Sequence, residues 1–148
     1  MANIDEEIKT KFENNKHRFI ANLMFTTNWF RNMNSEFLKP YKISMPQFNI
    51  LRILRGAKDW VSMNDIKSLM VDKSPNATRL ADKLVLANLV ERQRSESDRR
   101  VVYLKITPKG LELLSNIDES DTPHLNFLEN ITEEEARMVS DIFDRLRS

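Results

Sequence analysis

The spacing of hydrophobic residues changes from helical to alternating in one stretch of this 148-residue chain. Up to about residue 88, apolar residues recur at the three- and four-residue steps typical of helices. Between 90 and 106 they alternate with polar residues on both sides of the polar loop 95–100, which predicts a β-hairpin. Helical spacing then returns to the end. We therefore expect a mainly α fold with one small β-hairpin.

Composition excludes several classes of protein. The chain has no Cys, which excludes disulfides, Cys-ligated zinc and a thiol nucleophile. Its 2 Gly cannot form a dinucleotide- or phosphate-binding loop. Residues 1–9 are acidic and lack the apolar stretch of a signal peptide, and no apolar run is long enough for a membrane span, so we expect a cytoplasmic protein. His17 and His124 have no spaced partner ligand and no nucleophile–base pair is visible, so we predict no metal, no cofactor and no enzyme.

The first 40 residues are predicted to form one long helix that ends before Pro40. A lone helix of this length carries more apolar surface than one small core can cover. We therefore expect it to pack on another long helix, such as that of a second copy of the chain. Its apolar stripe consists of Ile4, Ile8, Phe12, Phe19, Leu23, Phe30 and Phe37.

Start and stop signals divide the next part of the chain into three short helices. Gly56 is predicted to end the first of them in the left-handed conformation. Ser62 has the position of an N-cap for the second. Ser74 and Pro75 are predicted to start the third, as N-cap and first helical residue. Asn88, which tolerates the left-handed conformation, is predicted to end it.

Two further helices follow the hairpin. Thr107 is the predicted N-cap of the first, with Pro108 at its first position. Thr132 and Glu135 form a predicted capping box at the start of the last helix. The expected apolar faces are Leu111, Leu113, Leu114 and Ile117 on the first helix, and Ala136, Val139, Phe143 and Leu146 on the last.

This order of elements predicts a winged helix-turn-helix, in which the second helix of the pair enters the DNA major groove. Arg79 can donate two hydrogen bonds to guanine, and Asn76 can pair with adenine. Ser74 and Thr78 can donate to phosphates. The side chains expected on this helix's DNA-facing side are Ser74, Asn76, Thr78, Arg79 and Asp82, with Lys83 at the edge.

The loop of the hairpin lacks Gly and is therefore expected to project rather than to form a tight turn. It offers Arg94, Arg99 and Arg100, and an arginine on such a loop can enter a narrow minor groove. Asp98 among these arginines would repel phosphate if it were free. We therefore expect it to orient a neighbouring arginine through a charge-assisted hydrogen bond.

Charge is distributed unevenly along the chain. The net charge of +1 results from +3 over residues 1–72, +5 over 73–110 and −7 over 111–148. A basic middle segment beside an acidic tail is typical of a nucleic-acid surface, although chance clustering of solvated charges gives the same numbers.

Five short segments carry a resemblance to a known family. They are 45–51 (MPQFNIL), 76–80 (NATRL), 88–92 (NLVER), 97–100 (SDRR) and 104–110 (LKITPKG). Together they resemble the MarR family of bacterial transcription regulators, and the order of elements agrees over roughly residues 8–148. Two positions depart from the family pattern, because Asn88 stands in place of the usual Gly and Lys67 in place of a small residue.

The resemblance implies a homodimer, held by N- and C-terminal helices, on a pseudo-palindromic operator. It also implies that the third helix contacts the major groove and Arg99 the minor groove, supported by Asp98 and Arg100. Many members of the family are repressors that a small anionic or phenolic ligand releases from DNA. From the residues themselves, His17, Trp29, Phe48 and Arg52 form a candidate pocket for an aromatic carboxylate, although such aromatics also serve as plain core.

The sequence thus predicts a single domain over 1–148. Residues 44–110 form its winged-helix DNA-binding region, and 1–40 with 118–148 its helical dimerisation region. The predicted function is that of a homodimeric repressor that binds double-stranded DNA sequence-specifically. Two alternatives remain open: a winged-helix module that binds only protein, and a ligand-binding dimer with vestigial DNA contact.

Overall fold

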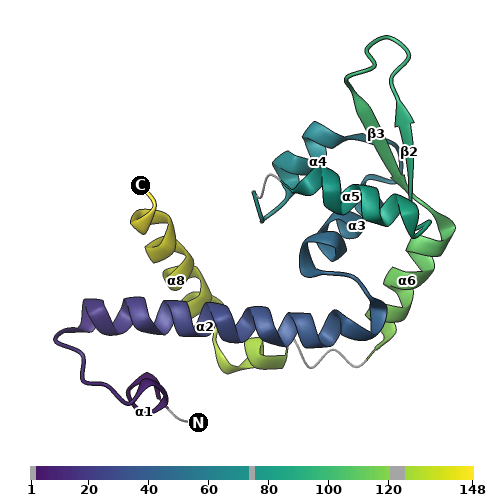
Figure 1. Cartoon of the computed structure of the whole chain (residues 1–148). Helices are drawn as coiled ribbons and strands as arrows, with labels where there is room; N and C mark the ends of the chain where they lie inside the picture. The colour runs from purple at the N-terminus through teal and green to yellow at the C-terminus, as the bar shows by residue number, and fades with distance from the viewer. Residues whose placement is uncertain (1–2, 74–75, 121–125) are drawn as a thin grey trace. The chain divides into compact units, whose positions relative to one another are not determined.

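The computed structural model describes residues 3–73, 76–120 and 126–148. The chain divides into two compact units, Met1–Met45 and Pro46–Ser148 (Figure 1). The fold is mainly helical with one small antiparallel sheet, as predicted. In the part of the chain that is described, no helix has the length and apolar character needed to cross a membrane.

The first unit contains two helices where the sequence predicted one. Helix α1 (Ile4–Ile8) ends at Lys9, which has a positive φ of 53°, and helix α2 runs from Asn15 to Leu38. The side chain of Asn14 accepts hydrogen bonds from two backbone amides of α2 and so begins a new helix. The prediction of a continuous helix was wrong because a periodic apolar stripe does not register these two caps. The short helix η1 (Lys39–Tyr41) then contains Pro40.

The second unit has the order of a winged helix-turn-helix. Its core contains the fully buried side chains of Leu51, Leu54, Ile66, Leu84, Leu104, Leu114 and Ile117. Its elements are α3 (Met45–Ala57, beginning at the last residue of the first unit), β1 (Val61–Ser62), α4 (Met63–Leu69), α5 (Ala77–Leu86), β2 (Val90–Arg94), β3 (Val102–Ile106), α6 (Pro108–Glu119), η2 (Phe127–Asn130) and α8 (Glu133–Leu146).

The sheet has three strands in the order β1–β3–β2, all antiparallel. The predicted hairpin is present, with Val90 opposite Ile106 and Arg94 opposite Val102. Strand β1 was not predicted, because two residues are too few to show an alternating pattern. It pairs Val61 with Leu104 and thereby connects the start of α4 to the hairpin. The hairpin projects beyond α4 and α5 (Figure 1).

The end of α3 differs from the prediction. Gly56 lies inside the helix and has no positive φ. Lys58 instead adopts the left-handed conformation, with φ of 61°, and its amide donates to the carbonyl of Leu54. The predicted Gly56 cap was therefore wrong by two residues, because the presence of Gly does not determine where the last helical hydrogen bond forms.

The end of α5 agrees with the prediction. Asn88 has φ of 59°, its amide donates to the carbonyl of Val85, and the amide of Leu89 donates to that of Leu84. These two bonds define a Schellman motif. Both Leu84 and Leu89 are buried, as this motif prefers. The chain therefore turns sharply and directly from α5 into β2.

Helix α6 begins as predicted and is joined tightly to that turn. The Thr107 hydroxyl accepts from the amide of Gly110 at 3.0 Å and donates to the carbonyl of Asn88 at 2.7 Å. Lys109 donates to the carbonyl of Ala87 at 3.1 Å. Of the predicted apolar face, Leu114 and Ile117 are buried, Leu113 is half-buried and Leu111 is exposed.

Helix α8 has the predicted capping box between Thr132 and Glu135. Of its predicted apolar face, Ala136 and Phe143 are half-buried, whereas Val139 and Leu146 are 44% and 55% exposed, and no residue of the helix is buried among the described residues. The apolar periodicity of α8 is thus present, but its side chains are only partly buried among the described residues.

Candidate nucleic-acid interface

Helix α5 presents one buried and one exposed face. Ala77, Ala81 and Leu84 are buried, whereas Thr78, Arg79 and Lys83 are exposed, in agreement with the predicted division. The helix begins at Ala77 with Asn76 as its N-cap, two residues later than predicted. Ser74 and Pro75, the predicted start, lie outside the described residues.

Two contacts hold the helix-turn-helix in shape. The amide of Gln47 on α3 donates to the carbonyl of Leu80 on α5 at 3.4 Å. The ammonium of Lys73 donates to the carbonyls of Lys67 and Ser68, at 3.2 and 2.7 Å, and so caps the end of α4. Because the last carbonyls of a helix lack internal partners, this lysine stabilises the turn that precedes α5. Sequence reasoning assigned no role to Lys73.

The loop between β2 and β3, residues 95–101, is here called the wing loop. Its ends are tied by a bond from the amide of Ser95 to the carbonyl of Val101, at 2.9 Å. Asp98 accepts two hydrogen bonds from the guanidinium of Arg100, at 3.1 and 3.3 Å, and one from its amide at 3.0 Å. The predicted pairing of Asp98 with an arginine is therefore confirmed.

The Asp98–Arg100 contact also sets the electrostatics of the wing loop. The guanidinium of Arg100, and then its amide, hold the pKa of the Asp98 carboxyl below the ordinary value of 3.8. Asp98 is therefore an anion whose charge is directed at Arg100. Arg94 and Arg99 are exposed, and within the described residues neither side chain makes a hydrogen bond or ion pair. The loop thus leaves two free cations on the hairpin.

We expect the backbone amide of Arg100 to report the protonation of Asp98. The depressed pKa means that the contact stabilises the loop above the ordinary pKa, and that this contribution is lost as the pH falls through the lower folded value. An NMR pH titration of the Arg100 amide should give a midpoint below 3.8. In Arg100→Gln the midpoint should move back towards the ordinary value. A midpoint at or above that value in the parent protein would contradict this description of the loop.

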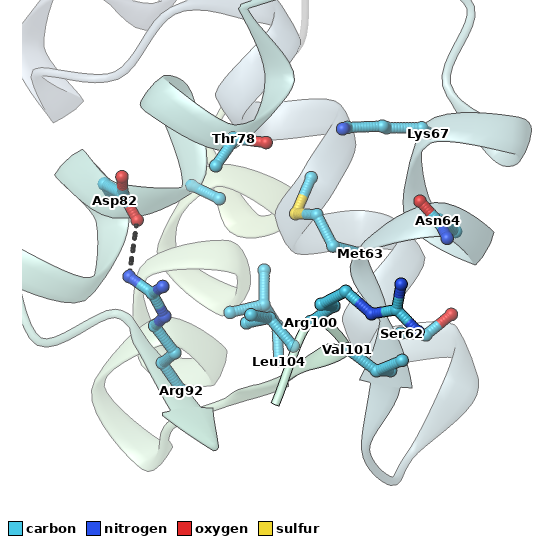
Figure 2. A pocket seen from close by; sticks show the side chains of 12 residues that line it. Ser62, Met63, Asn64, Lys67, Thr78, Asp82, Arg92, Arg100, Val101 and Leu104 are labelled. Atoms are coloured by element: carbon cyan, nitrogen blue, oxygen red, sulfur yellow. Dashed lines mark hydrogen bonds and ion pairs between the residues drawn. The ribbon is translucent and has the colours of Figure 1, made fainter. Parts of the chain in front are cut away.

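The cavity shown in Figure 2, of about 180 Å³, lies between α4, α5 and the sheet. Lys67, Thr78 and Arg100 are among its lining residues. At its edge, Arg92 on β2 donates to the carboxylate of Asp82 on α5 at 3.1 Å. Asp82, placed by the sequence on the DNA-facing side of its helix, therefore has its charge paired with the hairpin. Sequence reasoning missed the role of Arg92, and nothing in the local pattern marks a contact between a helix and a strand ten residues further along.

The four residues of the predicted ligand pocket belong to different units. His17 and Trp29 lie on α2, and His17 contacts Glu13 at 3.6 Å. Phe48 and Arg52 lie on α3, where the guanidinium carbon of Arg52 is 5.5 Å from the centre of the Phe48 ring. Within one unit, the structure therefore brings together only Phe48 and Arg52. Metal ligation is not indicated in the described residues, which contain no suitable cluster of three or more His, Cys, Asp or Glu; His124 lies outside them.

A family comparison matches residues 43–102 to the MarR family model. The curated regulator PecS from Dickeya dadantii is 32% identical over 72% of this chain and 66% of its own length. An HTH-type transcriptional regulator from Bacillus subtilis, YsmB, is 30% identical over 68% of both chains. The chain thus spans just under two thirds of the length of PecS.

The fold is also that of solved proteins. The crystal structure of a mutant MarR from E. coli, complexed with operator DNA, superimposes with a TM-score of 0.73 at 21% identity, over 93% of this chain and 99% of that one. A MarR transcription factor from Planctomyces limnophilus superimposes with a TM-score of 0.70 at 26% identity, over 90% and 98%. The predicted winged-helix fold is confirmed by these similarities.

Proposed function

Because this chain belongs to the MarR family, whose members are transcriptional regulators and not enzymes, we propose that it is a sequence-specific DNA-binding repressor. It acts in this proposal as a homodimer on a pseudo-palindromic operator. A dimer bound to an operator excludes other proteins from that DNA, which is why repression is the direction proposed.

One observation carries the proposal: α5 and the hairpin present four cations that are free of partners within the described residues. They are Arg79 and Lys83 on the exposed face of α5, and Arg94 and Arg99 on the hairpin. Unpaired cations in this arrangement fit the two grooves and the phosphates between them. The solved relative from E. coli, which has the same fold, was crystallised with operator DNA.

Each side chain then has a separate role. Arg79 and Asn76 contact base edges in the major groove. Thr78 and Lys83 contact phosphates, and Ser74 is assigned the same role from the sequence alone. Arg94 and Arg99 lie along the minor groove, where a narrow, electronegative groove favours arginine. Asp98 and Arg100 do not contact bases but keep the wing loop in shape.

Exposed apolar side chains on the terminal helices support the homodimer. Large apolar side chains that are exposed together mark sites of protein association. Burying them against a second copy would give the interface of an obligate dimer. They are Ile20, Met24, Phe25, Trp29 and Phe30 on α2, and Leu128, Ile131, Met138, Val139 and Leu146 in the C-terminal part.

We expect the protein to sediment as a dimer at micromolar concentration. Val139→Glu should shift it towards monomer, because a carboxylate would be buried in the interface. Arg137→Gln changes the net charge by the same amount on another side of α8, where Arg137 pairs with Asp141 and is 64% exposed. That control should remain dimeric. A stable monomer of the parent protein, measured by analytical ultracentrifugation, would rule out the dimer.

A small aromatic acid is the proposed effector. Arg52 beside the ring of Phe48 offers a cation and an aromatic surface, which suit such a ligand. Benzoate should raise the melting temperature of the parent protein and not that of Arg52→Gln. Equal shifts in both proteins, or no shift in either, would remove this site from the proposal.

Selection from a random pool of DNA duplexes tests the DNA-binding function. We expect enrichment of an inverted repeat whose half-sites are centred about 34 Å apart, one helical turn. Failure to enrich any sequence would contradict sequence-specific binding. Capture of a protein partner together with such a failure would favour the alternative of a protein-interaction module.

A further inference from the structure

We infer that the ion pair between Asp82 and Arg92 is a positioning contact, which fixes the hairpin relative to α5 and so sets the discrimination between operator and random DNA. This inference rests on the proposed function. In this inference Asp82 does not contact a base and Arg92 does not bind phosphate, because the two side chains bind each other. The contact is visible at the edge of the cavity in Figure 2.

The Asp82–Arg92 bond joins the middle of α5 to the middle of β2. The hairpin is joined to α5 at its base by the turn at Asn88 and by the Thr107 and Lys109 bonds to that turn. Strand β1 also ties β3 to the start of α4 at Leu104, but the bonds to the α5 side all lie at the turn that ends the helix. Asp82 lies in the middle of α5, and Arg92 lies in the middle of β2, opposite Leu104 on β3. Their hydrogen bond of 3.1 Å is thus a second point of attachment, away from the turn.

The ion pair also sets the charge on the exposed side of α5. Asp82 follows Arg79 by one turn of α5 and immediately precedes Lys83. An uncompensated carboxylate at this position would repel DNA phosphates. Arg92 neutralises that charge, so Asp82 no longer opposes the four free cations on α5 and the hairpin. The same hydrogen bond keeps the Arg92 guanidinium from binding a DNA phosphate.

Both partners of the ion pair are partly exposed to solvent. The side chains of Arg92 and Asp82 are 35% and 50% exposed. Ion pairs with this much solvent contribute little to the stability of a fold. Removing the pair should therefore leave the protein folded and its melting temperature nearly unchanged. The pair can instead orient the hairpin, because the hydrogen bond between Asp82 and Arg92 restricts the angle between α5 and the hairpin.

The decisive variant is Asp82→Asn, which removes the charge and keeps the shape. A simple charge effect predicts tighter binding to every DNA, because one negative charge is lost and Arg92 is released. The positioning role predicts the reverse for the operator. Its affinity should fall about tenfold, the order expected for the loss of one base contact. Affinity for a random duplex should be unchanged or higher, with a steeper dependence on salt.

The chain offers a closely matched control. Arg55 on α3 pairs with Asp118 on α6 at 2.6 Å, with side-chain exposures of 35% and 55%. Asp118→Asn changes the net charge by the same amount and removes a similar ion pair that does not involve α5 or the hairpin. It should leave the ratio of operator to random affinity unchanged. The double variant that combines Asp82→Arg with Arg92→Asp restores the ion pair with its charges exchanged. It should recover part of the operator-to-random affinity ratio that each single variant loses.

A measurement without DNA separates this inference from the proposed function. Since the chain has no Cys, cysteines introduced at Leu86 and Glu96 provide unique attachment sites for spin labels. Labelled chains diluted in unlabelled protein report the distance from the end of α5 to the wing loop. Asp82→Asn should broaden the distance distribution, and Asp118→Asn should not. If the parent bound all DNA equally, the proposed function would fail while this distance still tested the contact.

Two results would overturn the inference. One is a distance distribution in Asp82→Asn as narrow as that of the parent protein. The other is an increase in affinity for operator and random duplex by the same factor, which would reduce Asp82 to an unfavourable surface charge.

Discussion

Replacing Gly110 with Ala is expected to lower the free energy of unfolding by about 1–3 kcal/mol, the usual cost of overpacking a well-packed site. A Cβ at this position would clash with the backbone carbonyl of Leu89 and lie 2.7 Å from Cγ1 of Ile106. The carbonyl belongs to the turn that joins α5 to β2, so it cannot move aside without displacing one of them. Urea denaturation monitored by circular dichroism gives the change directly.

The other glycine provides the matched control. Gly56 lies inside α3 and an added Cβ would meet nothing within 4 Å. Gly56→Ala should therefore raise the free energy of unfolding by about 0.5–1 kcal/mol, because Ala loses less backbone freedom in a helix. Equal effects of the two substitutions would show that the close approach of α6 to Leu89 is not required for the fold.

Arg79→Ala is expected to weaken binding to the operator by about 1–3 kcal/mol and to relax the preference at the base pair that Arg79 contacts. Arg79 lies on the exposed face of α5, and its side chain makes no hydrogen bond or ion pair within the described residues. Its removal should therefore not change the melting temperature. Fluorescence anisotropy with operators altered at single positions measures both the loss and its position.

Variants at other arginines separate base contact from charge. Arg99→Ala should weaken binding most for operators that are AT-rich under the wing loop. Arg137→Ala on α8 removes the same charge from the proposed dimerisation region and should leave both the affinity and the base preference nearly unchanged. If Arg79→Ala bound every altered operator with the parent's preferences, Arg79 would not contact a base.

Local features were predictable from the sequence because their hydrogen bonds join near neighbours. Thr107 and Thr132 form N-caps, and Asn88 takes the left-handed conformation, all as predicted. The errors also have local causes. The caps at Lys9 and Asn14 interrupt an apolar stripe that continues on both sides of them, and Lys58 rather than Gly56 ends α3.

Contacts between distant elements were less predictable. The bond between Asp98 and Arg100 spans two residues and was predicted, whereas the bond between Asp82 and Arg92 was not. Helical spacing placed Asp82 correctly on the exposed side of α5. It could not show that a strand would bring an arginine to that side. The apolar face of α8 was likewise correct in pattern, although none of its residues is fully buried among the described residues.

The central claim is that α5 and the hairpin of this protein bind a particular DNA sequence. The most direct test is an affinity titration of the selected operator and of a scrambled duplex of the same composition, at several salt concentrations. We predict that the operator binds roughly a thousandfold or more tightly than the scrambled duplex, and that both affinities fall steeply with salt. Equal affinity for the two duplexes at every salt concentration would contradict the claim.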